Sequence, residues 1–296
     1  MPTASPPRLH AFAKINLTLE VLGKRADGYH EVRTILQTVD LADTLTFEDA
    51  EAVSLRVSPK GAAPVEGNLV LRAAGLLQAA AGARRGGRIV LRKRIPPAAG
   101  LGGGSSDAAT ALLGLRALWR PNLGDDALRN IAARLGSDVP FFLVGGTALG
   151  EGRGDAVTPL PAPVERWAVL IAVGSTDDHK TATLYGLLRP EHWSPDAPRT
   201  AEARRRLEKG EPLRGTLFNA FDAVVPQAYP AHERVLVAAH DAGLRDVHLA
   251  GAGPSLFALT PGRGEARSAA SWLRRKGWAA RAVRLVGPRE NSGMSS

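Results

Sequence analysis

The stretch that decides the fold reads Pro97-Ala98-Ala99-Gly100-Leu101-Gly102-Gly103-Gly104-Ser105-Ser106-Asp107. Four of the five positions 100–104 are glycine, so no Cβ there keeps the backbone N–H groups away from a bulky anion. Apolar residues follow at helical spacing, at Ala108, Ala111, Leu112, Leu115 and Leu118. The first turn of a helix presents unpaired N–H groups and the positive end of the helix dipole. The stretch therefore predicts a phosphate-binding loop that leads into a helix over residues 108–119.

This loop matches neither of the two commonest nucleotide-binding motifs. A P-loop requires Gly-Lys-Ser/Thr, and no lysine follows Gly104. The dinucleotide motif G-x-G-x-x-G requires a third glycine where Ser105 stands. The protein-kinase motifs H-R-D and D-F-G are absent as well. A surface turn with a serine N-cap is the plainer alternative, but it accounts for one glycine and one serine rather than for this density.

The composition is that of a soluble globular protein. With 296 residues, 44% of them hydrophobic and 23% charged, the chain suits two domains or one large one. No apolar run approaches the roughly 20 residues that cross a bilayer, and the first ten residues carry no signal peptide. Cysteine is absent, which excludes disulfides, thiol catalysis and cysteine-zinc sites. We therefore expect a cytoplasmic protein without a membrane partner.

The net charge of +9 raises the question of a nucleic-acid partner. Short basic clusters stand at residues 92–94, 204–206 and 274–276. Aromatic residues make up only 5% of the chain and do not alternate with these clusters, so no stacking surface for single strands is evident. We expect solvated arginines and no nucleic-acid partner, and a positive balance also suits a polyanionic small molecule.

An alternating strand near the N-terminus carries two polar candidates. Over residues 13–21 apolar and polar side chains alternate, which predicts a half-buried strand. Lys14 and Asn16 share its polar face. Further elements are expected in the first half of the chain: strands at 29–39, 44–48, 53–57 and 88–95, and helices at 68–81 and 125–135, the first capped by Asn68.

The second half of the chain predicts an α+β sandwich. A nearly continuous apolar run at 167–173 is typical of a buried strand and opens this part. Helices are expected at 181–188, 201–209, 217–227, 231–242 and 265–276, and further strands at 247–250, 255–259 and 279–286. The glycines at 251 and 253 mark the turn between two of these strands.

Asp138 and Lys14 are the best pair for acid–base chemistry. The helix at 125–135 stops at Gly136, and Pro140 biases Val139 to an extended conformation, which predicts a tight corner at Asp138. Transfer of a phosphoryl group to an alcohol needs a base, and a lysine beside a carboxylate keeps it ionised. Taken alone, Asp138 is more simply explained as an aspartate that bonds within its own turn, and Lys14 as a strand residue that faces solvent. Their separation in sequence leaves the pairing open.

Zinc and serine-hydrolase chemistry have no support. His30-Glu31 and His232-Glu233 begin like a zinc-protease motif, but neither has its second histidine. No serine stands in a G-x-S-x-G motif with a histidine partner.

Three segments in order resemble the three motifs of the GHMP kinase family: residues 12–17, 97–107 and 249–255. Residues 23–30, Gly-Lys-Arg-Ala-Asp-Gly-Tyr-His, resemble the branch that acts on a cytidylated polyol in non-mevalonate isoprenoid synthesis. Residues 136–140 resemble the catalytic-aspartate segment of that branch. The resemblance implies a two-domain α+β fold: an N-terminal nucleotide-binding domain at 1–165 and a C-terminal ferredoxin-like α/β sandwich at 166–296, with a cleft between them.

The resemblance also implies ATP and Mg²⁺ as cofactors and phosphorylation of the 2-hydroxyl of the polyol. Asp138 would be the base and Lys14 its electrostatic partner, residues 97–107 would hold the ATP phosphates, and Ser105 or Ser106 would lie near the metal. The residues that the resemblance assigns to the substrate are Asn16, Tyr29, His30, Thr181 and Tyr185.

Two other functions stay open. Another small-alcohol kinase of the family, for homoserine or mevalonate, would share the three motifs, although the segment 27–30 argues against it. A ligand-sensing regulator could keep the fold without activity, although Lys14 and Asp138 oppose this. The sequence leaves the oligomeric state, monomer or homodimer, open.

Overall fold

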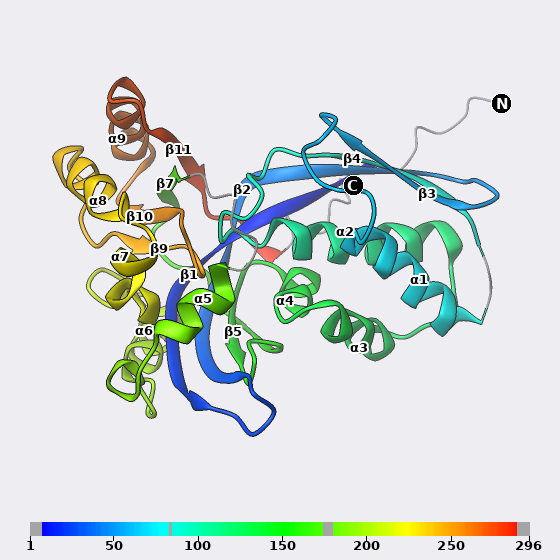
Figure 1. The fold of residues 1–296 in the computed structure, drawn as a ribbon, viewed down its shortest axis with the longest axis horizontal. Coiled ribbons are helices and arrows are strands. Elements are labelled where there is room, and N and C mark those ends of the chain that lie inside the picture. Colours follow the sequence, from blue (N-terminus) through cyan, green and yellow to red (C-terminus); the bar gives the residue numbers. More distant parts are fainter. Residues whose placement is uncertain (1–7, 83–84, 174–179, 289–296) are drawn as a thin grey trace.

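The computed structural model describes residues 8–82, 85–173 and 180–288, which form two β-sheets flanked by helices (Figure 1). In the larger sheet the strand order is β3-β4-β2-β1-β8, and β5 pairs with both β2 and β6. Its strands are β1 (Arg8–Lys24), β2 (His30–Glu48), β3 (Val53–Ser58), β4 (Gly87–Arg92), β5 (Thr147–Glu151), β6 (Ala156–Leu160) and β8 (Phe218–Asn219).

The first two strands are longer than the alternation predicts. The strand expected at 44–48 is the end of β2, which continues without a break from His30. Strands β5 and β6 were not expected, because glycines at their ends are typical of turns. Both strands form by pairing along β2, a long-range contact that local sequence does not encode.

Helices α1 to α4 cover one face of the larger sheet (Figure 1). They are α1 (Leu69–Ala81), α2 (Gly103–Trp119), α3 (Asp125–Leu135) and α4 (Val139–Val144). Asn68 caps α1 as predicted, since its side chain accepts a hydrogen bond from the N–H of Val70 at 3.0 Å. Helix α2 packs closely on the sheet at Gly114, where any Cβ would come within 2.3 Å of the Phe47 ring.

The corner at Asp138 is present, but its backbone differs from the prediction. Val139 is the first residue of helix α4 rather than extended, and Pro140 occupies an early helical position. Proline is tolerated in the first turn of a helix because the N–H that it lacks has no partner there. The bias that proline imposes on its neighbour is therefore overridden, and Asp138 lies between α3 and α4 as the residue before the helix.

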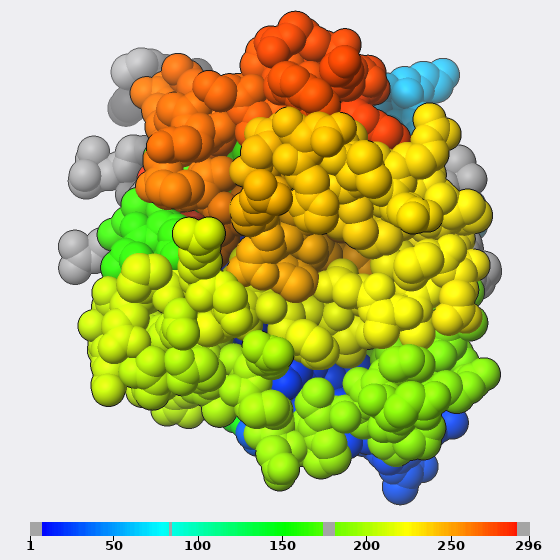
Figure 2. All heavy atoms as spheres, turned by 90° about the vertical axis from the view of Figure 1, so that its left-hand side faces the viewer, coloured from blue at the N-terminus to red at the C-terminus, as the bar shows by residue number. Residues whose placement is uncertain are grey.

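The smaller sheet has the connectivity of a ferredoxin-like sandwich. Its antiparallel strands lie in the order β11-β7-β10-β9. The strands are β7 (Trp167–Ala172), β9 (His248–Leu249), β10 (Leu256–Thr260) and β11 (Ala279–Arg284). The helices of this half are α5 (Lys180–Leu187), α6 (Pro198–Lys209), α7 (Val225–Ala228), α8 (His232–Asp241) and α9 (Arg263–Arg275), with 3₁₀ turns at Pro190–His192 and Ala220–Ala223. Figure 2 shows that the second half of the chain fills this side of the molecule, with blue residues of the first strands visible at the bottom.

The helix expected at 217–227 is wrong. Residues 218–219 form strand β8, which pairs in parallel with Thr18 and Leu19 of β1. The side chain of Asn219 donates to the carbonyls of Leu249 and Gly251 and accepts from the N–H of Phe221. These long-range bonds fix an extended backbone, so one strand from the second half of the chain joins the larger sheet.

Residues 13–21 of β1 are buried on both faces and not half-buried as predicted. On one face Ala13, Ile15 and Leu17 pack with residues of the smaller sheet in one apolar cluster. On the other face Lys14 is 4% exposed and Glu20 is 0% exposed. The carboxylate of Glu20 accepts the N–H groups of Arg199 and Thr200 in the first turn of α6. The polar face is therefore covered by the rest of the protein rather than by water.

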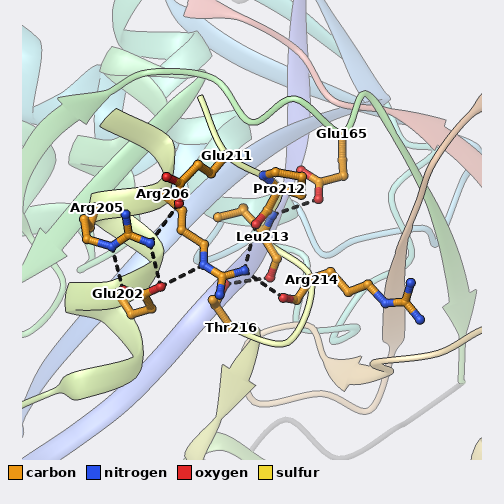
Figure 3. Close-up of polar contacts among 9 residues, drawn as sticks. All are labelled: Glu165, Glu202, Arg205, Arg206, Glu211, Pro212, Leu213, Arg214 and Thr216. Carbon is orange, nitrogen blue, oxygen red and sulfur yellow. Dashed lines mark hydrogen bonds and ion pairs between the residues drawn. The ribbon is translucent and has the colours of Figure 1, made fainter. Parts of the chain in front are cut away.

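Two arginines of the basic cluster at 204–206, Arg205 and Arg206, form ion pairs within the molecule (Figure 3). Arg205 pairs with Glu202 and Glu211, and Arg206 pairs with Glu202. The guanidinium of Arg206 also donates to the carbonyls of Pro212 and Arg214, which fixes the loop after α6. These arginines are structural ties between α6 and the following loop. None of the described helices has the length and apolar content of a membrane span.

Candidate active site

The glycine stretch is the N-terminus of α2, as predicted, although the helix begins within the glycines. Gly102 precedes the helix with φ of +69°, and the N–H of Ser106 makes the first helical bond, to the carbonyl of Gly102 at 2.9 Å. The N–H groups of residues 103–105 come before that bond, and the first turn holds no acidic residue. The end of α2 therefore keeps its positive dipole for an external anion.

The loop is also built for close approach to another segment. Gly100 has φ of +79°, and a Cβ on it would lie 2.0 Å from the carbonyl oxygen of Ala250. Gly251 has φ of +61°, and a Cβ there would lie 2.8 Å from the carbonyl oxygen of Gly100. The turn at 250–253, which composition alone assigns to a plain hairpin, thus lies directly against the glycine loop.

Lys14 and Asp138 meet beside this loop. Nζ of Lys14 is 3.6 Å from Oδ2 of Asp138, and the backbone N–H of Lys14 donates to the carbonyl of Leu101 at 3.0 Å. The carboxylate of Asp138 makes no capping hydrogen bond to α4 within the described chain. It is 36% exposed, whereas the lysine is buried. The fold therefore joins a buried ammonium to a partly exposed carboxylate at the end of α2.

Asn16 orients the ammonium. Its Oδ1 accepts a hydrogen bond from Nζ of Lys14 at 2.7 Å, and its Nδ2 donates to Oγ1 of Thr34 at 2.8 Å. The hydroxyl of Thr34 donates in turn to the carbonyl of Thr18. Each donor in this series has an acceptor, so the position of the ammonium is fixed by the strands beneath it.

Below the loop lies a buried ion cluster of Asp43, Lys93 and Asp107. Nζ of Lys93 is 2.5 Å from Asp43 and 2.7 Å from Asp107, and Asp43 also accepts the N–H groups of Arg94 and Ile95. Burial raises the pKa of Asp107 to about 7, although Lys93 acts in the opposite direction. Oδ1 of Asp107 is buried and has no hydrogen-bond partner among the described residues.

Lys93 is not among the predicted site residues, because the basic cluster at 92–94 is expected from the sequence to be solvated. Its position in the strand expected at 88–95 was a usable signal of burial, since Ile89, Leu91 and Lys93 share one face by alternation. Ile89 and Leu91 are fully buried, and the side chain of Lys93 is 8% exposed. Asp43 follows the same rule in β2, where Leu45 and Phe47 alternate with it on the buried face.

The two candidate serines differ in their surroundings. Ser105 is partly exposed in the first turn of α2, whereas Ser106 is buried. Ser106 lines a water-sized hollow of about 10 Å³ together with His10, Phe12 and Phe142. Of the two hydroxyls, that of Ser105 is the more accessible to a ligand at the helix end.

Two of the candidate cytosine-binding residues, His30 and Tyr185, form a second group beside the Lys14–Asp138 pair. The rings of His30 and Tyr185 stack with centroids 4.6 Å apart, and Tyr185 packs edge-on against Phe221 at 4.9 Å. Burial and the nearby charge of Asp138 raise the pKa of Tyr185 to about 12. The charge of Asp138 therefore acts on the hydroxyl of Tyr185, which connects the aromatic residues to the Lys14–Asp138 ion pair.

Tyr29 and Thr181 lie at the exposed edge of this group. Tyr29 is 56% exposed, and its ring lies under the guanidinium of Arg153. Thr181 is exposed in the first turn of α5, four residues before Tyr185 and therefore on the same side of the helix. Burial and the charge of Lys24 lower the pKa of His30, which favours the neutral imidazole.

A groove of about 940 Å³ lies elsewhere, between α9 and the loops at 212–217 and 241–246. None of the predicted site residues that the structure describes lines it. The candidate site is therefore defined by its charges, its helix end and its aromatic residues rather than by the size of a hollow.

Known proteins resemble this chain in sequence and in fold. Residues 68–146 match the profile of the GHMP kinases N terminal domain. A protein of Pelotomaculum thermopropionicum named 4-diphosphocytidyl-2-C-methyl-D-erythritol kinase is 41% identical over 94% of this chain and 98% of its own length. A crystal structure of 4-(cytidine 5'-diphospho)-2C-methyl-D-erythritol kinase has a TM-score of 0.80 at 39% identity, covering 95% of this chain and 99% of its own.

A more distant similarity concerns the fold alone. The crystal structure of homoserine kinase from Cytophaga hutchinsonii has a TM-score of 0.75 at 18% identity, covering 97% of each chain. The α+β fold is thus shared across kinases of different names, and the relative and the crystal structure named above as erythritol kinases are 41% and 39% identical to this chain over nearly its whole length. This chain belongs to the GHMP kinase family, in the branch of the 4-diphosphocytidyl-2-C-methyl-D-erythritol kinases.

Proposed function

We propose that this chain transfers the γ-phosphoryl group of ATP to the 2-hydroxyl of 4-diphosphocytidyl-2-C-methyl-D-erythritol, in the cytoplasm. The observation that carries the proposal is the placement of Lys14 Nζ 3.6 Å from Asp138 Oδ2, beside the N-terminus of α2. An ammonium, a partly exposed carboxylate and a helix end that attracts phosphate are what phosphoryl transfer to an alcohol requires.

Asp138 serves as the base. Its carboxylate accepts the proton of the 2-hydroxyl while the hydroxyl oxygen bonds to the γ-phosphorus, and the bond from that phosphorus to the bridging oxygen of ADP breaks. Lys14 places a positive charge beside the oxygen as negative charge develops on it. Because Asn16 fixes the ammonium, this charge is in place before the substrate arrives.

Residues 97–107 hold the phosphates of ATP mainly through the backbone. No side chain of the described residues caps the N–H groups at the start of α2, no carboxylate stands in the first turn, and three successive glycines, 102–104, leave the backbone accessible. The buried carboxylate of Asp107 supports this turn from below through Lys93. We therefore assign Asp107 to the loop as its anchor.

Mg²⁺ fits the oxygen donors at this helix end. The described residues contain no group of three His, Cys, Asp or Glu side chains that could hold a metal by themselves. The ion would accordingly be held by the ATP phosphates together with Ser105 or Ser106, and we favour Ser105 because it is the more exposed. When bound, Mg²⁺ neutralises the charge of the phosphates.

The cytosine end of the substrate is assigned to Tyr29, His30 and Tyr185. The neutral imidazole of His30 offers one donor and one acceptor, which matches the polar edge of cytosine. Tyr29 and Tyr185 supply stacking surfaces, with Thr181 on the same side of α5 and Asn16 at the ammonium. The proximity of Tyr185 to Asp138 supports one substrate spanning both groups.

A coupled ADP-release assay with the full chain tests the proposal. The cytidylated methylerythritol, homoserine and mevalonate are compared at equal concentration with ATP and Mg²⁺. Turnover with the cytidylated substrate alone is the expected result. Preferential turnover of homoserine or mevalonate would reassign the chain within its family, and the absence of turnover with all three would favour a ligand-sensing regulator.

A further inference from the structure

The hairpin loop between β5 and β6 lies beside the turn that carries Tyr29. The N–H of Val32 donates to the carbonyl of Gly152 at 2.8 Å, and Nε of Arg33 pairs with the carboxylate of Glu151 at 3.1 Å. Both contacts join the loop to the start of β2. The loop therefore holds a fixed position relative to Tyr29.

Arg153, within this loop, lays its guanidinium on the ring of Tyr29. Its Cζ is 5.1 Å from the ring centroid, which is within the range of a cation–π contact. Asp155 fixes the same arginine, with Nη2 2.8 Å from Oδ2 and the backbone N–H of Arg153 3.2 Å from Oδ1. The side chains of both members of this ion pair are partly buried, so the guanidinium is oriented.

The Tyr29 ring needs such support because the bonds of its turn fix only the backbone. The N–H of Tyr29 donates to the carboxylate of Asp27 at 3.1 Å, and its carbonyl accepts from the N–H of Arg25 at 2.8 Å. These bonds leave the rotamer of an exposed side chain open. An exposed ring that becomes ordered only on binding lowers affinity, since ligand binding then includes the cost of ordering it.

We propose that Arg153 is a positioning residue that holds the ring of Tyr29 ready to stack on the base of a cytidine-containing substrate. This inference rests on the proposed function, which assigns Tyr29 to the cytosine. Arg153 acts through Tyr29 and not on the phosphates. Lysine would keep the charge but lose the planar group that lies on the ring and pairs with Asp155.

Titration calorimetry with cytidine and with cytidine diphosphate tests the inference on the wild-type chain and Arg153→Gln. The Kd of both ligands is expected to rise by the same factor, about 2- to 5-fold. In steady-state assays the KM for the cytidylated substrate rises, while kcat and the KM for ATP stay at wild-type values. The Kd and KM values of Arg153→Lys are expected to lie between those of the wild type and those of Arg153→Gln. A loss confined to cytidine diphosphate would assign Arg153 to the phosphates and overturn the inference.

A double-variant cycle shows whether Arg153 acts through the ring. In the Tyr29→Ala background Arg153→Gln should cause no further loss, and an undiminished second loss would contradict the inference. Arg129→Gln is the matched control, because Arg129 is an exposed arginine of α3 paired with Asp126 at 2.7 Å. A wild-type chain that does not turn over the cytidylated substrate would refute the proposed function, and this inference with it. If the wild-type chain is fully active and Arg153→Gln has the same Kd and KM values, this inference alone would be refuted.

Discussion

Gly251 lies so close to Lys14 that a Cβ on the glycine would be 2.7 Å from the lysine Nζ. The two residues are far apart in the sequence and meet beside the glycine loop, since the same Cβ would lie 2.8 Å from the carbonyl oxygen of Gly100. Three segments far apart in sequence therefore share one small volume. The absence of a side chain at 251 leaves the space that the ammonium fills.

Gly251→Ala should lower kcat strongly. The new methyl group would displace the ammonium from Asp138, and alanine is strained at φ of +61°. A misplacement of about 1 Å costs on the order of 100-fold in rate, which is the loss we expect in the ADP-release assay. Gly264→Ala in α9 is the control, since its Cβ would meet open space. Equal activity of both variants would show that the ammonium does not depend on Gly251.

Asp138→Asn should abolish most turnover while leaving ATP binding unchanged. The amide keeps the shape of the carboxylate but cannot accept the proton, and a general base contributes about 10²- to 10⁴-fold. Turnover is measured by ADP release, and ATP affinity by calorimetry on the same preparation. A variant with near-wild-type kcat would remove Asp138 from the position of base.

Tyr29→Ala should raise the KM for the cytidylated substrate more than it changes the KM for ATP. Stacking of an aromatic pair contributes about 0.5–1.5 kcal/mol beyond burial, which corresponds to roughly a 2- to 10-fold change. Steady-state kinetics with each substrate varied in turn measures both constants. An unchanged KM for the cytidylated substrate would contradict the assignment of Tyr29 to the cytosine.

Local sequence patterns correctly predicted the helices and strands whose caps and apolar periodicity lie within the element itself. Asn68 caps α1, the helix at 125–135 has the predicted bounds, and the apolar run at 167–173 is strand β7. At residues 217–227, where the predicted helix is wrong, a contact from a distant part of the chain decides the structure. Residues 218–219 form a strand because Asn219 bonds to the carbonyls of Leu249 and Gly251.

The site divides in the same way. The glycine loop and its helix were readable from residues 97–119, because a phosphate-binding helix end is a local feature. The pairing of Lys14 with Asp138 followed from family resemblance and not from spacing. The burial of Lys14 was not predicted, because α6 and the turn at 250–253, which cover that face of β1, come from the other end of the chain.

Lys93→Met should destabilise the fold strongly. Removal of the ammonium leaves the carboxylates of Asp43 and Asp107 buried together without a cation, and breaking a buried ion pair costs about 3–5 kcal/mol. Urea unfolding of the purified chain measures the free energy. Arg88→Met, in the strand β4 that precedes Lys93, removes an exposed pair with Glu48 and should cost less than about 1 kcal/mol. Similar losses in the two variants would mean that the cluster below the glycine loop contributes no more than a surface pair.

His248 should make stability depend on pH in the alkaline range. Its Nδ1 is 2.6 Å from Asp222 and its Nε2 is 3.0 Å from Asp246, and hydrogen bonds to these two carboxylates raise the pKa of His248 to about 9, against desolvation that lowers it. Because the folded pKa exceeds the unfolded value of 6.5, the contribution is fully present below pH 6.5 and is lost as the pH rises through 9.

The shift corresponds to roughly 3 kcal/mol at most. Urea unfolding at half-unit steps from pH 6 to pH 10 should therefore show a loss of stability in the wild type that is absent from His248→Asn. His240→Asn serves as the control, because His240 is exposed on α8 and should keep the wild-type slope. Parallel curves for the wild type and His248→Asn would mean that the imidazole is neutral between its two carboxylates, and that β9 is held against the 3₁₀ turn at Ala220–Ala223 by hydrogen bonds without charge.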